Sequence, residues 1–232
     1  VISRHADLDL AAQGVARSAF CLSGQKCSAC SRVYVERDVH DEFVAKLAER
    51  ADALVVGDPL LRETYLGPVI DAAAVDRYTD AVAHARKVGR VVTGGQALAG
   101  VDGRPDGHYL APTVVADVPA DDELFTRELF VPLVAVAPVD SLDEAFDLAN
   151  DSPLGLTAGF FSADDAEVDA FLARIAAGVV YVNRPAGATT GAWPGVQPFG
   201  GWKGSGSTGK AGGGPYYVQQ FLREQSQTVV SS

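Results

Sequence analysis

The sequence reads Gly24-Gln25-Lys26-Cys27-Ser28-Ala29-Cys30-Ser31-Arg32 where a helix-like segment gives way to a strand-like one. Upstream, Asp7 and Asp9 suit the start of a helix. Apolar residues then recur at helical spacing, namely Leu8, Ala11, Ala12, Val15, Ala19 and Leu22. Downstream, residues 32–36 alternate as a half-buried strand does. The pattern therefore places Cys27 in a loop of small residues between a helix and a strand, where a nucleophilic thiol would be accessible.

The rest of the chain alternates helical and strand patterns. We expect helices near residues 41–54, 71–88, 142–150 and 164–177, and strands near residues 90–93, 129–136, 157–161 and 178–183. Such alternation is typical of an α/β domain built on a parallel sheet. The sequence therefore predicts the α/β fold class.

Two long loops interrupt this alternation, at residues 94–107 and 185–215. The second is dense in Gly, Thr and Pro, a composition that also suits a flexible linker. It carries bulky aromatic residues, however, which are Trp193, Phe199, Trp202, Tyr216 and Tyr217. We therefore interpret it as an ordered wall of a functional site. After a helical stretch at residues 217–223, residues 227–230 form a short β-prone segment that could pair with another subunit.

Composition bounds the class of protein. The 232 residues are 47% hydrophobic and 21% charged, which is typical of a globular domain. The net charge of −11 and the dispersed basic residues disfavour nucleic acid as a partner. Neither an 18-residue apolar run nor a secretory leader is visible, so we expect a cytoplasmic protein, or a mitochondrial matrix protein if the source is eukaryotic. The chain has no Met, which suggests a piece of a longer polypeptide.

The three cysteines have different expected roles. Cys27 is either a nucleophile or a small buried apolar residue. Cys21 falls in the helical segment and is expected in the core. For Cys30, packing and mild redox sensitivity both stay open. A Cys27/Cys30 redox pair is disfavoured because the motif precedes a strand, and zinc is disfavoured because a second ligand pair is lacking, so we expect no metal site. An odd number of thiols favours a reducing compartment.

Taken together, the motifs resemble the aldehyde dehydrogenase superfamily. The thiol segment, GQKCSACSRVYVE after RHADLDLA, is followed in family order by four further motifs: ELFVP (128–132), NDSPLGL (150–156), YVNR (181–184) and TGAWPGVQPFGGWKGSG (190–206). The resemblance spans nearly the whole chain and leans toward the L-glutamate γ-semialdehyde (1-pyrroline-5-carboxylate) dehydrogenases. It implies an α/β catalytic domain with a parallel sheet and a C-terminal oligomerisation strand.

The resemblance also implies roles for individual residues. Cys27 corresponds to the nucleophile, which forms a hemithioacetal and then a thioester. Glu128 and Phe130 correspond to the residues that hold the nicotinamide ribose and ring of NAD, with NADP left open. Substrate-binding positions correspond to Ser28, Gly191, Ala192 and Phe199: the first three hold an amino-acid carboxylate, and the ring packs on the aliphatic chain. Val131 stands where the family more commonly has glycine. This departure weakens the expectation that the backbone has the family's shape here, because a positive φ is unfavourable for Val.

The implied organisation is a catalytic (thiol) domain over residues 1–215 and a helix with an oligomerisation arm over residues 216–232. We expect the NAD-binding domain and the glutamate that activates water to precede the residue matching Val1. On that reading the chain alone oxidises no aldehyde at a useful rate, and the parent is a homo-oligomer that acts on a small aldehyde. Two alternatives stay open: another aldehyde dehydrogenase, such as one for succinate semialdehyde, and a non-catalytic remnant that binds a partner subunit.

Overall fold

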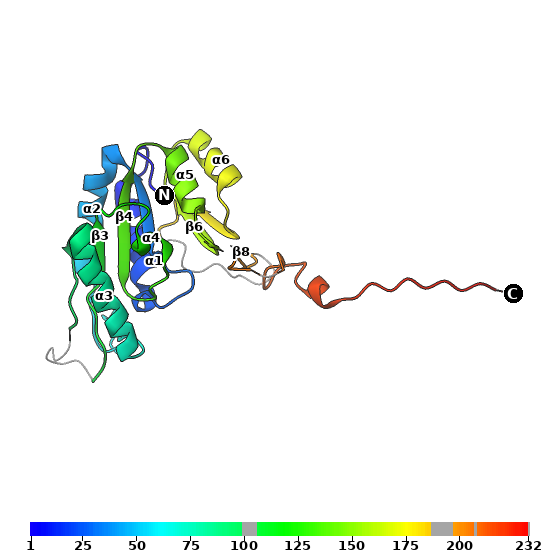
Figure 1. The fold of residues 1–232 in the computed structure, drawn as a ribbon, viewed down its shortest axis with the longest axis horizontal. Helices are drawn as coiled ribbons and strands as arrows, with labels where there is room; N and C mark the ends of the chain where they lie inside the picture. Colours follow the sequence, from blue (N-terminus) through cyan, green and yellow to red (C-terminus); the bar gives the residue numbers. More distant parts are fainter. Residues whose placement is uncertain (99–105, 187–196, 207, 232) are drawn as a thin grey trace.

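The computed structural model describes residues 1–98, 106–186, 197–206 and 208–231 (Figure 1). Its helices are α1 (Leu8–Phe20), α2 (Arg37–Asp52), α3 (Ala72–Val88), α4 (Glu123–Thr126), α5 (Leu142–Asn150) and α6 (Asp165–Arg174), with 3₁₀ turns η1 (Cys21–Gly24) and η2 (Val218–Phe221). Its strands are β1 (Arg32–Glu36), β2 (Arg90–Thr93), β3 (Thr113–Ala116), β4 (Leu133–Val139), β5 (Leu154–Gly155), β6 (Thr157–Phe160), β7 (Val179–Val182) and β8 (Trp202–Lys203).

The main sheet has the strand order β1-β4-β3-β2. β4 pairs in parallel with both β1 and β3, whereas β2 joins β3 in antiparallel orientation. The predicted α/β fold is confirmed by this mixture of helices and a sheet containing parallel strands. At the edge of the sheet, β2 departs from the parallel arrangement, because it runs antiparallel to β3.

Residues 1–3 connect this sheet to the parallel pair β6–β7. The Ile2 amide donates to the Tyr34 carbonyl at 2.9 Å, and the Ser3 amide donates to the Phe161 carbonyl at 3.0 Å. Ile2 is completely buried and lies in parallel register with Val35 on one side and Phe161 on the other. The chain therefore forms one extended array in which residues 1–3 lie between β1 and β6.

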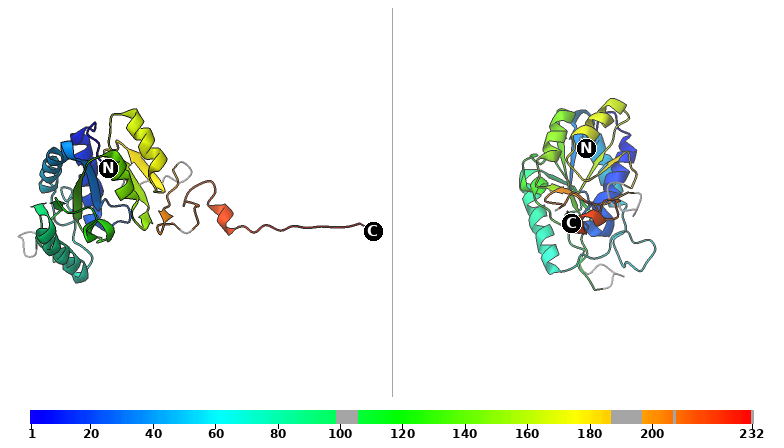
Figure 2. Two further views of the ribbon diagram at one scale, coloured as in Figure 1. Left: turned by 45° about the horizontal axis from the view of Figure 1, so that its top comes forward. Right: turned by 90° about the vertical axis from the view of Figure 1, so that its right-hand side faces the viewer.

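The faces of the main sheet follow from the alternation of its side chains. Val33, Val35 and Val134 point to the cluster formed with α1 and α2. Tyr34 and Ala135 point to the opposite cluster, formed with α3, α4 and α5. The right-hand view of Figure 2 shows α1 and α3 on opposite sides of the sheet. β4 is apolar on both faces because helices cover both of them.

Several element boundaries differ from the sequence expectations. α1 ends at Phe20, so Cys21 is half-buried in η1 and the prediction that it lies in the core of a helix is wrong. β4 begins at Leu133 instead of residue 129, because Phe130 has a left-handed φ of 58° and Pro132 has no N–H to donate. α6 ends at Arg174, before the predicted residue 177.

The end of α6 has a specific cause in the side chain of Asn150. Its amide nitrogen donates to the Arg174 carbonyl at 2.9 Å, and its amide oxygen accepts from the Ala176 amide at 2.7 Å. These two bonds satisfy backbone groups at the helix C-terminus and turn the chain toward β7. Asn150 thus determines where α6 stops.

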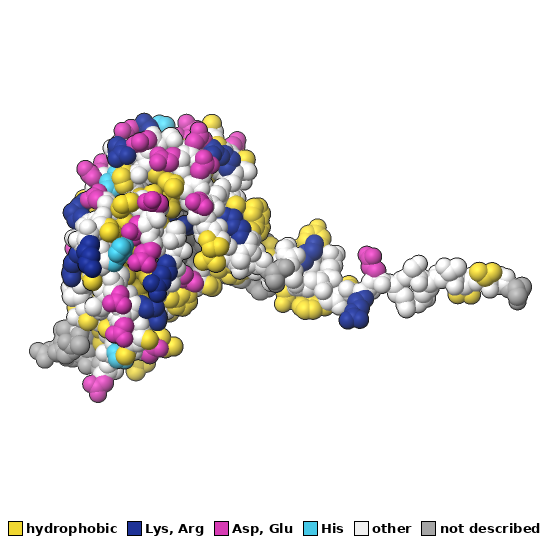
Figure 3. All heavy atoms as spheres, in the orientation of Figure 1, with side chains coloured by type: hydrophobic (Ala, Val, Ile, Leu, Met, Phe, Trp, Pro, Cys, Tyr) yellow, Lys and Arg dark blue, Asp and Glu magenta, His cyan; other side chains and the backbone are white. Residues whose placement is uncertain are grey.

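The chain beyond β8 leaves the folded body as an extended tail (Figure 1). It carries η2 and then residues 222–231 without helix or strand, so the helix predicted over residues 217–223 is reduced to one 3₁₀ turn. Its apolar side chains are exposed, and Figure 3 shows them along the tail, namely Tyr216, Tyr217, Val218, Phe221, Leu222, Val229 and Val230. Among the described residues, no helix combines the length and apolarity needed to cross a bilayer.

We expect Phe160→Ala to destabilise the fold strongly. Phe160 is completely buried and stacks on Phe171 with ring centroids 4.9 Å apart. Large-to-small changes at such positions cost about 3–5 kcal/mol of unfolding free energy. Urea unfolding followed by circular dichroism measures the loss. Leu172→Ala on the same helix as Phe171 serves as the control, because Leu172 is 49% exposed. Equal losses in the two variants would contradict the assignment of the core.

A second prediction concerns acid stability. Glu36 accepts two hydrogen bonds from the Arg4 guanidinium, at 2.6 and 2.9 Å, and one from the Arg4 amide at 2.7 Å. Burial raises the pKa of Glu36, but these hydrogen bonds outweigh it and hold the pKa below its ordinary 4.5. The ionised pair therefore stabilises the fold above pH 4.5, and this stabilisation is lost as the pH falls through the lower folded pKa.

The measurement is the unfolding free energy of wild type and Glu36→Gln between pH 7 and pH 3. We expect the variant to be less stable at pH 7 and the difference to shrink below pH 4.5. A difference that stays constant across this range would show that Glu36 contributes no pH-dependent stability.

Candidate active site

The thiol loop begins with a run of left-handed backbone. Leu22 and Ser23 have φ/ψ of 54/33° and 56/34°, and Gly24 has a φ of 70°. This conformation costs an L-residue roughly 1–2 kcal/mol, so a helix does not continue through it. The run ends the helical path of α1, and the Gln25 amide after it donates to the Leu22 carbonyl at 3.0 Å.

Gly24 lies against the backbone of the segment before β4. A Cβ at this position would stand 2.3 Å from the Val131 carbonyl oxygen and 2.7 Å from its carbon. Both this contact and the positive φ require glycine. The close approach brings the loop that carries Cys27 directly against residues 128–132, two motifs that are about a hundred positions apart in the sequence.

Cys27 and Ser28 occupy the centre of a tight turn. The Ala29 amide donates to the Lys26 carbonyl at 2.9 Å, and the Cys30 amide donates to the Ser18 carbonyl at 3.2 Å. These bonds fix the far side of the turn to α1. Cys27 is exposed, whereas Ser28 is 2% exposed. The turn therefore presents the Cys27 thiol outward and holds the neighbouring serine inside.

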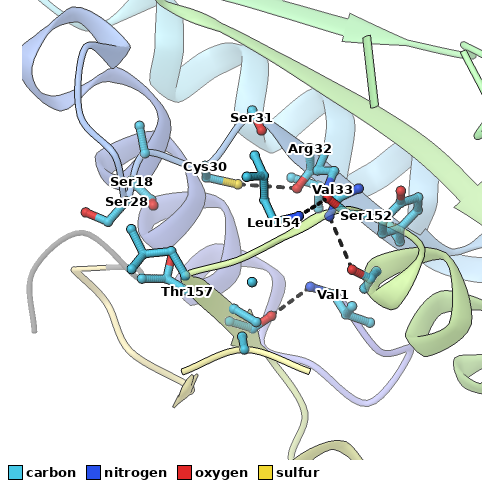
Figure 4. Close-up of a pocket in the computed structure, with 18 of the residues that line it drawn as sticks. Val1, Ser18, Ser28, Cys30, Ser31, Arg32, Val33, Ser152, Leu154 and Thr157 are labelled. Carbon is cyan, nitrogen blue, oxygen red and sulfur yellow. Dashed lines mark hydrogen bonds between the residues drawn. The ribbon is translucent and has the colours of Figure 1, made fainter. Parts of the chain in front are cut away.

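Both residues line a cavity of about 410 Å³. Its walls come from the thiol turn, from β1, from the segment before β4 and from residues around β5 and β6. In Figure 4, Ser28 lies at one end of this cavity and Val1 toward the other. A cavity of this size accommodates a small organic molecule.

Cys30 has a different environment from Cys27. Its thiol donates to the Arg32 carbonyl with an S···O distance of 3.4 Å, as Figure 4 shows. Burial raises the pKa of Cys30, and the nearby cationic groups offset only part of that effect. A thiol with a raised pKa is a poor nucleophile at neutral pH because little thiolate forms. Cys30 packs against the hydrophobic cluster of α1, α2 and the sheet, and Cys27 is the exposed thiol of the pair.

Glu128 and Phe130 lie beside this thiol turn. Glu128 is exposed and lines both the main cavity and a second space of about 30 Å³, whose wall also includes Lys26 and Phe130. The Phe130 ring is 39% exposed. The positive φ belongs to Phe130, while Val131 is 4% exposed and packs in the core, so the valine does not distort this backbone.

Of the remaining predicted substrate residues, Phe199 is not among the described residues that line this cavity. Gly191 and Ala192 lie outside the described residues. Phe199 is half-buried and pairs through its backbone with Gly212. The described part of the long Gly-rich loop does reach the cavity, through Gly204 and Ser205.

The cavity wall also contains residues that the sequence pattern did not single out. Arg32 donates to the carbonyls of Phe125 at 2.9 Å and Ala149 at 3.2 Å, so it ties β1 to α4 and α5. Ser18 lies on α1, and its buried hydroxyl has no hydrogen-bond partner among the described residues. Neither role was visible in sequence, because each depends on elements that meet only in the folded chain.

One cluster of potential metal ligands occurs among the described residues, formed by His5, Asp164 and Glu167. Its groups already have protein partners. His5 Nδ1 lies 2.9 Å from Glu167 Oε1, Asp164 caps α6, and Glu167 accepts from the hydroxyls of Ser3 and Ser162. We therefore interpret the cluster as a clamp between residues 3–5 and α6.

Known proteins are similar to this chain in sequence and in structure. A family model described as the aldehyde dehydrogenase family matches residues 1–227. The 1-pyrroline-5-carboxylate dehydrogenase of Geobacillus sp. (strain WCH70) is 39% identical over 229 residues, which are 99% of this chain and 42% of that protein. The chain therefore spans less than half the length of this curated relative.

Solved structures agree with the sequence comparison. The structure of 1-pyrroline-5-carboxylate dehydrogenase from Thermus with bound NAD matches with a TM-score of 0.87 at 36% identity, over 96% of this chain and 41% of that one. Proline utilization A from Bdellovibrio bacteriovorus matches with a TM-score of 0.85 at 40% identity, over 96% of this chain and 22% of that one. The resemblance inferred from the motifs is confirmed. Because the family model matches almost the whole chain, this chain belongs to the aldehyde dehydrogenase family.

Proposed function

We propose that the protein carrying this chain oxidises L-glutamate γ-semialdehyde, the open form of 1-pyrroline-5-carboxylate, to L-glutamate with NAD. The observation that carries the proposal is the exposed Cys27 thiol on a constrained turn, beside buried Ser28 and next to Glu128. The relatives named 1-pyrroline-5-carboxylate dehydrogenase support this choice of substrate. Because the chain spans 42% of such a relative, the activity is assigned to the whole protein.

In the proposed reaction, Cys27 acts as the nucleophile. Its thiolate attacks the aldehyde carbon, a C–S bond forms, and the carbonyl oxygen becomes an oxyanion that the Cys27 backbone N–H stabilises. When the C=O bond re-forms, the carbon loses hydride and a thioester results. Bound NAD supplies the hydride acceptor. Water then breaks the C–S bond, which releases the carboxylate and restores the thiol.

The substrate's amino-acid end requires separate recognition. We assign its α-carboxylate to the Ser28 hydroxyl and to the backbone N–H groups of Gly191 and Ala192, since successive amides bind anions well. The Phe199 ring covers the aliphatic part of the substrate. These four residues together would distinguish an amino-acid aldehyde from one without an α-amino acid group.

The chain's own residues fit a nicotinamide cofactor at Glu128 and Phe130. A carboxylate accepts hydrogen bonds from ribose hydroxyls, and an exposed flat ring suits a planar partner. Phe130 is 39% exposed and has a left-handed φ. Stacking of a bound nicotinamide ring on Phe130 would offset the free-energy cost of this backbone conformation. These two side chains adjoin the thiol turn, where the hydride leaves.

The tail supports a further part of the proposal, which is assembly with a second copy through residues 216–230. Its exposed apolar side chains lack a covering surface in the described chain, and its last residues are extended. Extended segments of this kind add to the edge of another sheet. These features support the proposed role of the tail as an oligomerisation arm.

The first functional prediction concerns the nucleophile. We expect Cys27→Ala to abolish NAD-linked oxidation of L-glutamate γ-semialdehyde in the full-length protein, because no thiolate remains to form the hemithioacetal. Cys30→Ala is the matched control and should retain most of the activity. NADH absorbance measures both. Turnover by Cys27→Ala at the wild-type rate would refute the mechanism, and a preference for succinate semialdehyde would remove only the substrate assignment.

A second prediction uses alkylation in the same full-length protein. Iodoacetamide should modify Cys27 before Cys30 at neutral pH, because Cys27 is exposed and burial raises the Cys30 pKa. Peptide mapping by mass spectrometry identifies the modified thiol. Glutamate should slow the reaction at Cys27 whereas succinate should not, since only glutamate carries the α-amino acid group. Equal protection by the two acids would contradict recognition of that group.

A further inference from the structure

We propose that Ser23 and Gln25 are positioning residues that hold the Cys27 turn in its reactive orientation by bonding to the segment between α2 and α3. The inference rests on the proposed function of Cys27. It assigns a role to two side chains, and to residues 66–70, that are not among the residues lining either cavity.

The two side chains make complementary bonds to that segment. The Ser23 hydroxyl donates to the Gly67 carbonyl at 2.7 Å, and the Gln25 side-chain oxygen accepts from the Ile70 amide at 3.0 Å. The four residues form a clamp, which we call the Ser23/Gln25 clamp. Ser23 is 2% exposed and its bond is partly buried, whereas the bond between Gln25 and Ile70 is exposed. The partners lie 44 and 45 positions apart in the sequence.

The clamp restrains a backbone that has a local reason to relax. Leu22 and Ser23 are non-glycine residues with positive φ, a backbone conformation that is unfavourable for L-residues. Strained backbone persists only where surrounding contacts hold it, and such strain concentrates at functional sites. Gly24 is blocked on one side by the Val131 carbonyl. The Ser23/Gln25 clamp supplies the second restraint.

The segment that receives the clamp is itself fixed. Leu66 is completely buried, and its amide donates to the Val55 carbonyl at 3.1 Å. The Val69 amide donates to the His108 carbonyl at 2.8 Å, and Asp71 caps α3 through the Ala74 amide. Residues 66–70 are therefore anchored at both ends, and they transmit the rigidity of the body to the loop.

Position along the chain links the clamp to the chemistry. Gln25 is two residues before Cys27, and the other side of the turn is held by the Cys30 amide on the Ser18 carbonyl. Loss of the Gln25 bond would remove the side-chain restraint nearest to Cys27 on this side of the turn. Misplacement of a reacting atom by about 1 Å can cost a hundredfold in rate. The clamp should therefore influence kcat more than KM, because it orients the thiol and does not touch the substrate.

The test compares four variants of the full-length protein. Ser23→Ala removes the donor, and Gln25→Met removes the acceptor at similar size. Gln25→Glu is the conservative rescue, because a carboxylate still accepts from the Ile70 amide. Ser141→Ala is the control for stability alone, since it removes the side-chain cap of α5, a bond of 3.2 Å to the Glu144 amide, far from the thiol turn in sequence and element.

Two readouts are needed. Amide hydrogen exchange of peptides covering residues 21–31 and 66–72 reports the clamp without any reference to activity. We expect faster exchange in Ser23→Ala and Gln25→Met, including loss of protection at Ile70 in the latter, and exchange near that of wild type in Gln25→Glu and Ser141→Ala. For aldehyde oxidation we expect kcat to fall about tenfold in the first two variants with KM within about twofold, and to recover in Gln25→Glu.

The outcomes separate the two proposals. Unchanged exchange in Ser23→Ala and Gln25→Met would overturn the clamp, and faster exchange with unchanged kcat would overturn its positioning role. The positioning role would also be overturned if kcat fell as far in Gln25→Glu and Ser141→Ala as in Ser23→Ala and Gln25→Met. Such a result would show a general effect of stability. A wild-type protein that oxidises no aldehyde would refute the proposed function and with it the catalytic role, while hydrogen exchange would still decide whether the clamp exists.

Discussion

The close approach of Gly24 to the Val131 carbonyl is the constraint on which the site depends. A Cβ would come within 2.3 Å of that oxygen, so only glycine allows the thiol loop to lie against the segment before β4. That contact sets Cys27 beside Glu128 and Phe130, which come from a distant part of the sequence. Without it, Cys27 and the proposed cofactor-binding residues would belong to separate surfaces.

The fold supplies rigid supports for this contact from two directions. α1 holds one side of the turn through the Ser18 carbonyl, and residues 66–70 hold the other through the side chains of Ser23 and Gln25. Arg32 extends the support by linking β1 to α4 and α5. The Cys27 thiol is thus carried on a short turn whose flanking residues are bonded to α1 and to residues 66–70, an arrangement that combines access with fixed orientation.

Local patterns predicted the parts of this structure that depend on local physics. β1, β2 and α5 have the predicted bounds, and α3 begins one residue after the predicted Asp71. Capping residues such as Asp71 and Ser141, and the alternation around Val33, act over a few residues, so the sequence pattern reveals them. β3 was missed, since four residues become a strand only between β2 and β4. The position of Cys27 in a loop was predictable, but the left-handed Leu22 and Ser23 and their bonds to residues 66–70 were not. Those bonds join positions more than forty residues apart.

The central claim is that the turn presents Cys27, and neither of the other thiols, to an aldehyde. The most direct measurement is acid quenching of the full-length protein during turnover of L-glutamate γ-semialdehyde with NAD, followed by peptide mapping for a glutamyl thioester. We expect the acyl group on the peptide that contains Cys27, at its sulfur, with Cys21 and Cys30 unmodified. An acyl group on either of those thiols, or turnover in a protein whose Cys27 stays free throughout, would contradict it.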